Sequence, residues 1–176
     1  MLVMIGPLSG KNFIQKLSYF IYTFGVWDIF YYITLKIFLN RPQSILAWDI
    51  LFLIPVPWIR PVIAHVTCAS TMILMGIIII NFEESGINMK IDFFEWIFII
   101  LGSLIILFTF IYDYLKLIID GIIKYGFKNL MNNIVFLNEI SMFIPTKYNY
   151  LLFIIGEILI VIIRIYLKSR RKLFYR

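Results

Sequence analysis

The sequence predicts an all-α fold, a polytopic bundle of four to six transmembrane helices that forms a single membrane domain over residues 1–176. Hydrophobic residues make up 62% of the chain and charged residues 15%, which leaves too little polar surface to coat a soluble globule of this length. Several apolar stretches also approach the roughly 20 residues that a helix needs to cross a hydrocarbon core. The lipid bilayer is therefore the first partner that we expect.

Four apolar windows of the sequence are long enough, or nearly long enough, to cross a membrane, and each contains very few charged residues. The acidic, basic and histidine residues inside them are Asp28 in the first, His65 in the second, Glu95 in the third, and Glu157 with Arg164 in the fourth. We expect transmembrane helices over residues 17–35, 61–80, 93–112 and 148–167.

The ends of these helices follow from local signals. Asn40-Arg41-Pro42 should stop the first helix, because proline disfavours α geometry in the residue before it. Pro61 suits the first turn of the next helix, where its missing N–H is not needed. Asp92 and Glu95 have the spacing of a capping box. The acidic stretch 81–91 is therefore expected to be a short loop.

The second segment, residues 44–58, is ambiguous. A helix over 44–54 would be only about 16 Å long, and Pro55-Val56-Pro57 then forces extended backbone, which covers nearly 19 Å to Arg60 at about 3.1 Å per residue. If the helix and the extended stretch run in the same direction, they just cross a membrane. If they run in opposite directions, they form a re-entrant hairpin. In either case the carbonyls freed by the prolines must face protein or water.

Residues 113–132 have polar side chains at spacings of three and four with apolar residues between them, which predicts an amphipathic helix in the headgroup plane. Residues 130–144 would be either a short polar span or more interfacial structure. If both ambiguous segments cross, six spans result and Arg60 is cytoplasmic. With four spans and a re-entrant segment, Lys116 and Lys124 lie outside. Both models place the basic C-terminal tail, and both termini, in the cytoplasm.

The net charge of +6 is carried by short clusters beside apolar segments, a distribution that fits the positive-inside rule and not a nucleic-acid partner. The chain has one cysteine, Cys68, and one histidine. An intrachain disulfide is therefore excluded, and so is a bis-histidine haem unless the chain dimerises, whereas a haem held by His65 and a methionine stays open. Phosphate-binding glycine loops and His-Glu-x-x-His are absent, and no cofactor is identified.

The candidate site residues are titratable groups inside apolar sequence. Asp28 and Asp49 each stand in a Trp-Asp-Ile tripeptide, and an acid at such depth costs about 2.5–3.5 kcal/mol on insertion scales. They could be satisfied by neighbours such as the hydroxyls of Tyr31 or Tyr32, or they could bind a proton or a cation. Glu157 is a third buried acid, beside Gly156, which allows close helix approach.

Helical rise puts Asp49 about 9 Å and His65 about 6 Å from the Pro-rich connection, and Asp28 about 7 Å away in depth from Asp49. We therefore predict that Asp49 pairs with His65. A carboxylate favours the charged imidazolium whereas burial opposes it, so this pair would be a candidate proton switch. The three residues also include ligand types that suit a divalent metal.

The blocks Phe24-Gly25-Val26-Trp27-Asp28-Ile29-Phe30-Tyr31-Tyr32 and Trp48-Asp49-Ile50-Leu51-Phe52-Leu53-Ile54-Pro55-Val56-Pro57-Trp58 resemble small multi-span integral membrane proteins of prokaryotes with paired Trp-Asp motifs. The resemblance covers about a fifth of the chain. It implies the inner (cytoplasmic) membrane as the location, and it implies no mechanism.

Together these features predict a transporter-like or accessory subunit in which Asp28, Asp49, His65 and Glu157 handle a proton or a cation. One alternative is a membrane-embedded enzyme or a metal- or haem-binding component that uses the same residues. Another is a purely structural subunit of a larger complex. A membrane-protein partner or a second copy of the chain fits each of these hypotheses.

Overall fold

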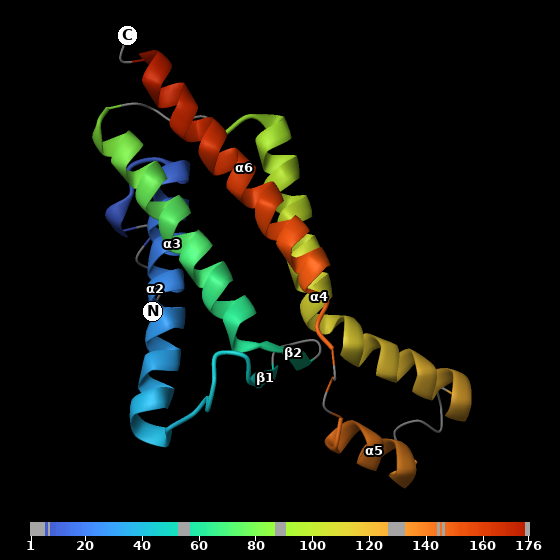
Figure 1. Ribbon diagram of the computed structural model, residues 1–176. Coiled ribbons are helices and arrows are strands. Elements are labelled where there is room, and N and C mark those ends of the chain that lie inside the picture. Colours follow the sequence, from blue (N-terminus) through green and yellow to red (C-terminus); the bar gives the residue numbers. More distant parts are fainter. Residues whose placement is uncertain are drawn as a thin grey trace.

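The computed structural model describes residues 6, 8–52, 57–86, 91–126, 133–143, 145 and 147–174, with the backbone alone for residues 51, 52, 57, 141 and 163–174. These residues are mostly helical, as predicted, with one small two-stranded sheet. The elements labelled in Figure 1 are the helices α2 (Phe13–Leu39), α3 (Val62–Glu84), α4 (Phe93–Tyr125), α5 (Ile134–Ser141) and α6 (Tyr150–Phe174), and the strands β1 (Trp48–Phe52) and β2 (Pro57–Pro61).

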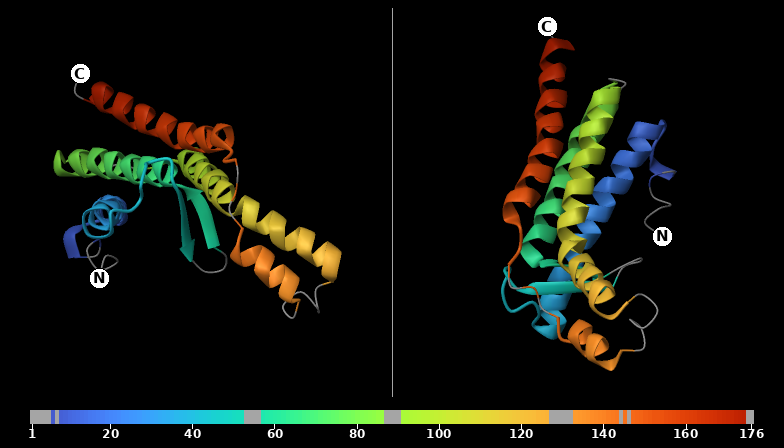
Figure 2. Two further views of the ribbon diagram at one scale, coloured as in Figure 1. Left: turned by 60° about the horizontal axis from the view of Figure 1, so that its bottom comes forward. Right: turned by 90° about the vertical axis from the view of Figure 1, so that its right-hand side faces the viewer.

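Four long helices run alternately in opposite directions, α2 and α4 one way and α3 and α6 the other (Figures 1 and 2). α2 packs chiefly against α3, and α4 packs chiefly against α6. The start of α2, the end of α3, the start of α4 and the C-terminal end of α6 therefore lie at one end of the bundle. The sheet and α5 lie at the other end, which we call the hairpin end.

The predicted helix over residues 44–54 is wrong, because this segment leads into strand β1. β1 pairs with β2 in an antiparallel hairpin that places Asp49 opposite Arg60 and Trp48 opposite Pro61. Prolines stand at both ends of β2, positions where a strand tolerates them and a helix does not. The segment therefore makes its hydrogen bonds across a hairpin and does not cross the bundle. Residues 53–56, which join the strands and include Pro55, lie outside the described part of the chain.

The hairpin continues directly into the first turn of α3. The N–H groups of Val62 and Ile63 donate to the carbonyls of Ala47 and Ile45, at 3.0 and 2.9 Å. Amides of a first helical turn have no partner within the helix, so this backbone pairing satisfies two of them. It attaches the sheet firmly to the start of α3.

The predicted helix ends are confirmed at two places. α2 ends at Leu39, and Asn40 adopts the left-handed conformation that commonly follows a helix, with φ 50°. Asp92 and Glu95 form the predicted capping box at the start of α4. Pro61 precedes α3 as its N-cap. However, α3 continues to Glu84, four residues into the stretch that we expected to be loop.

The predicted amphipathic helix is not a separate element. Its described part, from Asp113 to Tyr125, is the last portion of α4, which bends and runs out beside α5 (Figure 1). Residues 127–132, with Lys128 and Asn132, lie outside the described residues. Between residues 130 and 144 the described residues form only α5, whose eight residues cover about 12 Å. Helix α5 is therefore too short to cross a membrane.

Among the described residues, two helices are long and apolar enough to cross a membrane, α3 and α4, whereas the sequence predicted four to six spans. The six-span arrangement is wrong, because neither residues 44–58 nor residues 130–144 form a crossing helix. α2 is long, but tyrosines and Asp28 lower its apolar character. The described apolar stretch of α6, Tyr150–Ile162, is shorter than a full span.

The two halves of the bundle meet around a buried apolar cluster near the hairpin end. Its members are Ala64 on α3, Ile106 and Phe110 on α4, Tyr148, and Phe153 on α6. Farther along, α4 and α6 approach closely at Gly102 and Gly156, where a Cβ built on either residue would lie within 3.0 Å of the other's carbonyl oxygen. The close approach expected at Gly156 is confirmed.

Candidate functional site

The two Trp-Asp-Ile tripeptides lie in different secondary structures. The first is in helix α2, where Trp27 is half exposed and Asp28 is buried. The second begins strand β1, where Asp49 is half-buried. The two copies are therefore not a structural repeat. They nevertheless bring their carboxylates to the same region, the junction of α2, α3 and the hairpin.

Asp28 pairs with His65 of α3. Its Oδ2 lies 2.5 Å from Nε2 of the imidazole, and the two side chains are only 10% and 12% exposed. The predicted partner of His65, Asp49, is replaced by Asp28. Our depth estimate treated residues 44–54 as helix, and the hairpin moves Asp49 away from the position that a helix would give it.

Asp49 instead accepts a hydrogen bond from the hydroxyl of Tyr32, at 2.5 Å. Tyr32 follows Asp28 by one helical turn, so the two side chains project from the same face of α2. The ring of Tyr32 also packs edge-on against the imidazole of His65, with ring centroids 5.1 Å apart. Tyr32 thus connects the Asp49 carboxylate to the Asp28–His65 pair. Its hydroxyl is the hydrogen-bond donor to an aspartate that we considered, from the sequence, for Tyr31 or Tyr32.

Arg60 of β2 completes this group, and only 1% of it is exposed. Its Nη2 contacts Nδ1 of His65. A guanidinium can only donate hydrogen bonds, so Nδ1 must accept and the remaining imidazole proton must be on Nε2. Nε2–H then donates to Asp28. The three side chains form a chain of donors and acceptors in which a neutral imidazole separates a cation from an anion.

The burial of Arg60 contradicts the six-span alternative, in which it was a cytoplasmic cation. The guanidinium carbon lies 4.4 Å from the ring centroid of Phe110 and 5.6 Å from that of Trp58, within range of cation–π attraction. Its Nε and Nη1 are buried without a hydrogen-bond partner. Removal from water lowers the pKa of Arg60, while Tyr32, Cys68, Asp49 and Asp28 act in the opposite direction.

Glu157 lies apart from the Asp28–His65 pair, on α6. It is 8% exposed and accepts a hydrogen bond from the hydroxyl of Thr71 on α3, at 2.7 Å. Cys68, one turn before Thr71, is a second neighbour of this carboxylate. Glu157 therefore ties α6 to α3, and the four predicted residues divide into three contacts, Asp28–His65, Asp49–Tyr32 and Glu157–Thr71.

Two contributors to this region were not predicted as site residues. Arg60 was counted only as a topological charge, and Thr71 was not considered. The available signal for Arg60 was its place between two prolines in Pro57-Trp58-Ile59-Arg60-Pro61, a stretch that favours strand and therefore a fixed partner. Two buried acids beside a histidine also require a compensating cation.

The predicted metal site at Asp28, Asp49 and His65 is not assembled. In the described part of the chain, no three His, Cys, Asp or Glu side chains lie close enough together to hold a metal ion. The carboxylates and the imidazole have hydrogen-bonding neighbours, whereas Nε and Nη1 of Arg60 have none among the described residues. No family model, curated protein or solved structure matches this chain.

Proposed function

We propose that this chain is a four-span membrane protein, a transporter-like or accessory subunit, that handles protons through Asp28, His65 and Arg60. The observation that carries the proposal is the buried chain from Arg60 through His65 to Asp28. A titratable residue at such depth in an apolar bundle is a functional candidate by default.

Membrane residence is supported by the outward faces of the helices, which carry many large apolar side chains. A soluble protein rarely leaves a contiguous apolar patch of this extent in water. On α4 these exposed residues include Phe98, Ile100, Leu101, Leu104 and Phe108, and on α6 they include Leu151, Ile154, Ile155, Ile158 and Ile162. Lipid is the surrounding that suits both helices.

Four spans are the number that the alternating helices support, with the hairpin as the re-entrant segment. The start of α2 and the C-terminal end of α6 then share one side of the membrane. The tail carries Lys168, Arg170, Arg171, Lys172 and Arg176, which favours the cytoplasm for that side. Together with the resemblance noted in the sequence, this supports the inner membrane of a prokaryotic cell as the proposed location.

The proton step concerns a single atom, Nδ1 of His65. Nδ1 either accepts a hydrogen bond from Arg60 or carries a proton of its own, because the same lone pair serves both purposes. Protonation of His65 therefore displaces the guanidinium while the Nε2–H bond to Asp28 remains. Arg60 belongs to the hairpin, and so proton uptake moves a charge on β2 relative to α3.

The test exploits the presence of only one histidine in the chain. The protein is expressed with an affinity tag that contains no histidine, labelled with ¹⁵N-histidine, and studied by NMR in lipid while the pH is lowered. We expect the neutral imidazole to carry its proton on Nε2 and to gain a second proton on Nδ1. A neutral imidazole with its proton on Nδ1, or one that never takes up the second proton, would refute the mechanism.

Proton movement is measured in liposomes under an imposed membrane potential, with a pH-sensitive dye inside. The wild type is expected to pass protons, and His65→Gln to reduce the rate at least tenfold. Glu139→Gln is the matched control, since Glu139 is a half-exposed acid at the hairpin end, far along the chain from the Asp28–His65 pair. Equal proton rates in the wild type and His65→Gln would exclude a proton-handling role.

A further inference from the structure

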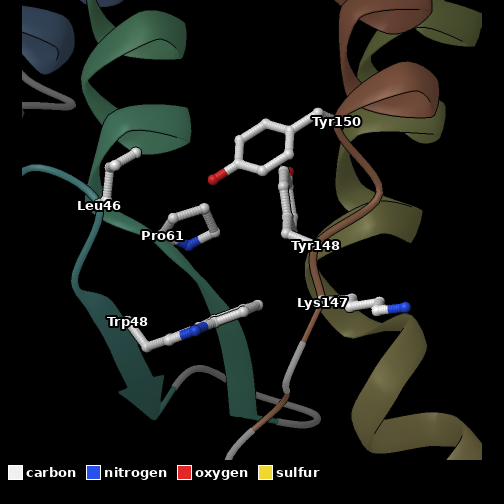
Figure 3. Close-up of a pocket in the computed structure, with 6 residues that line it drawn as sticks. All are labelled: Leu46, Trp48, Pro61, Lys147, Tyr148 and Tyr150. Atoms are coloured by element: carbon white, nitrogen blue, oxygen red, sulfur yellow. The ribbon is translucent and has the colours of Figure 1, made fainter.

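A second candidate site lies at the hairpin end. It is an open cavity of about 380 Å³ between the hairpin and the start of α6 (Figure 3). Three of its lining residues are aromatic, and its other walls are Leu46, Pro61 and Lys147. None of the residues of the proposed proton chain lines it, so it needs an explanation of its own.

The three aromatic rings form a corner. The ring of Tyr148 is nearly perpendicular to that of Trp48, at 78°, and to that of Tyr150, at 80°, with centroids 6.2 and 4.9 Å away. Walls of Trp and Tyr set at right angles around a space are the arrangement by which proteins recognise quaternary ammonium groups, through attraction of the cation to the ring faces. Tyr148 is fixed in place, since it is 9% exposed and shares a hydrogen bond with Thr109.

The positive charge of Lys147, at the edge of the cavity, indicates which class of ligand fits. Lys147 is exposed, and its ammonium points away from the three rings (Figure 3). A lone cation would gain nothing from this lysine, whereas a ligand that carries an anion next to its ammonium would gain a charge-assisted contact. The geometry points to a zwitterion with a quaternary ammonium inside the cavity and a phosphate at Lys147.

We propose that this cavity binds phosphocholine-type groups, with the headgroup of a zwitterionic phospholipid as the source. The cavity lies where α3 and α6 begin, at Pro61 and Tyr150, which is headgroup depth for a helix that starts at the membrane surface. Trp and Tyr side chains are enriched at that depth. The lipid source rests on the membrane placement proposed above, but not on the proton chemistry.

The experiment uses the full chain in a maltoside detergent, which carries neither charge nor ammonium. Calorimetric titrations with phosphocholine, tetramethylammonium and inorganic phosphate measure the affinity for each part of the ligand. Titrations with dihexanoylphosphatidylcholine and the corresponding phosphatidylglycerol distinguish a lipid from a free headgroup. We expect saturable binding of phosphocholine, tighter binding of the choline lipid, and weaker binding of tetramethylammonium.

Single substitutions separate the two ends of the ligand. Tyr150→Leu should weaken phosphocholine binding about tenfold, which corresponds to 1.4 kcal/mol at 25 °C, whereas Tyr150→Phe keeps the ring and should bind like the wild type. Lys147→Gln should weaken phosphocholine binding but leave tetramethylammonium binding unchanged. Tyr112→Leu is the matched control, because Tyr112 on α4 has similar exposure, 46% against 43% for Tyr150, and does not line the cavity.

Several outcomes would overturn the proposal. They are the absence of saturable binding by the wild type, equal affinity of Tyr150→Leu and Tyr112→Leu, and preference for phosphatidylglycerol over phosphatidylcholine. Free phosphocholine binding as tightly as the lipid would reject the lipid source alone. His65→Gln should bind phosphocholine like the wild type, so a failure of the proton mechanism leaves this result unaffected.

Discussion

The carboxylate of Asp28 and the imidazole of His65, from two neighbouring helices, lie 2.5 Å apart with almost all of both side chains removed from solvent. Nδ1 on the far side of the imidazole accepts from Arg60, so the bond to Asp28 is that of a neutral donor to an anion. The energetic consequences of this arrangement differ from those of an ordinary salt bridge, and substitutions can distinguish the two.

Asp28→Asn should lower the free energy of unfolding by only about 1 kcal/mol, because an amide oxygen can still accept the Nε2–H bond. Asp28→Leu should cost about 3 kcal/mol, since it leaves the buried Nε2–H donor of His65 without an acceptor. Chemical unfolding in detergent measures both values. Asp120→Asn, at an exposed position of α4, is the control and should change little. Equal losses for the two Asp28 variants would contradict a neutral imidazole.

Arg60→Met should lower the free energy of unfolding by about 3 kcal/mol, because it leaves the buried carboxylate of Asp28 without a nearby cation and Nδ1 of His65 without a donor. The same variant should lose the proton movement proposed for the wild type. Thermal unfolding and the liposome assay are performed on one preparation. Unchanged stability would contradict the compensating role of the guanidinium.

The pKa of Tyr148 is raised above its usual value, mainly by burial. Its contribution to stability is therefore complete below the ordinary tyrosine value near 10 and decreases as the pH rises above it, because the unfolded chain loses the phenolic proton first. Tyr148→Phe should lose about 1 kcal/mol at neutral pH with its hydrogen bond to Thr109. It should also show a shallower decline of stability at alkaline pH. Parallel curves for the wild type and the variant would contradict this account.

Gly102→Ala should lower stability by about 1–3 kcal/mol, because the added methyl group would lie 2.8 Å from the carbonyl oxygen of Gly156 and would force α4 away from α6. Ser103→Ala, at the next and exposed position, is the control and should stay within about 0.5 kcal/mol. Thermal unfolding of both variants in the same detergent makes the comparison. A neutral Gly102→Ala would mean that the two helices are not held in close contact.

Single cysteines in a Cys68→Ser background test the four-span topology. A membrane-impermeant maleimide should label Asp120→Cys, at the hairpin end, in intact spheroplasts. It should label Ser169→Cys, in the tail, only after permeabilisation, because the basic tail favours the cytoplasm. The opposite pattern would reverse the orientation, and labelling of both positions from outside would reject the arrangement itself.

Features encoded by a few adjacent residues were predictable from the sequence. The end of α2 at Asn40 and the capping box of Asp92 and Glu95 depend on local backbone chemistry, and both are found where expected. The secondary structure of residues 48–61 could not be predicted from the sequence. A short run of apolar β-branched and aromatic residues close to prolines fits a strand as well as a short helix. Only pairing with a second strand distinguishes the two.

The partners of the buried groups depend on that choice. If residues 44–54 were helical, Asp49 would lie at the depth of His65. On the hairpin, Asp49 accepts a hydrogen bond from Tyr32 instead, and His65 pairs with Asp28. Arg60 was misplaced for a related reason, since counting charges by the positive-inside rule treats each cation as exposed. The acids were recognisable from sequence as candidates, but their partners are set by tertiary contacts between distant residues.

The division of the molecule into two helix pairs, α2 with α3 and α4 with α6, has a mechanical consequence. Among the described residues, Arg60 of the hairpin lies above the ring of Phe110 on α4, and Glu157 of α6 contacts Thr71 and Cys68 of α3. A rocking movement of one helix pair relative to the other would change the distances across both contacts, the first at the hairpin end and the second farther along α3. Protonation that releases Arg60 from His65 would therefore loosen the contact between the hairpin and Phe110. The contact between Glu157 and Thr71 would still hold the two helix pairs together.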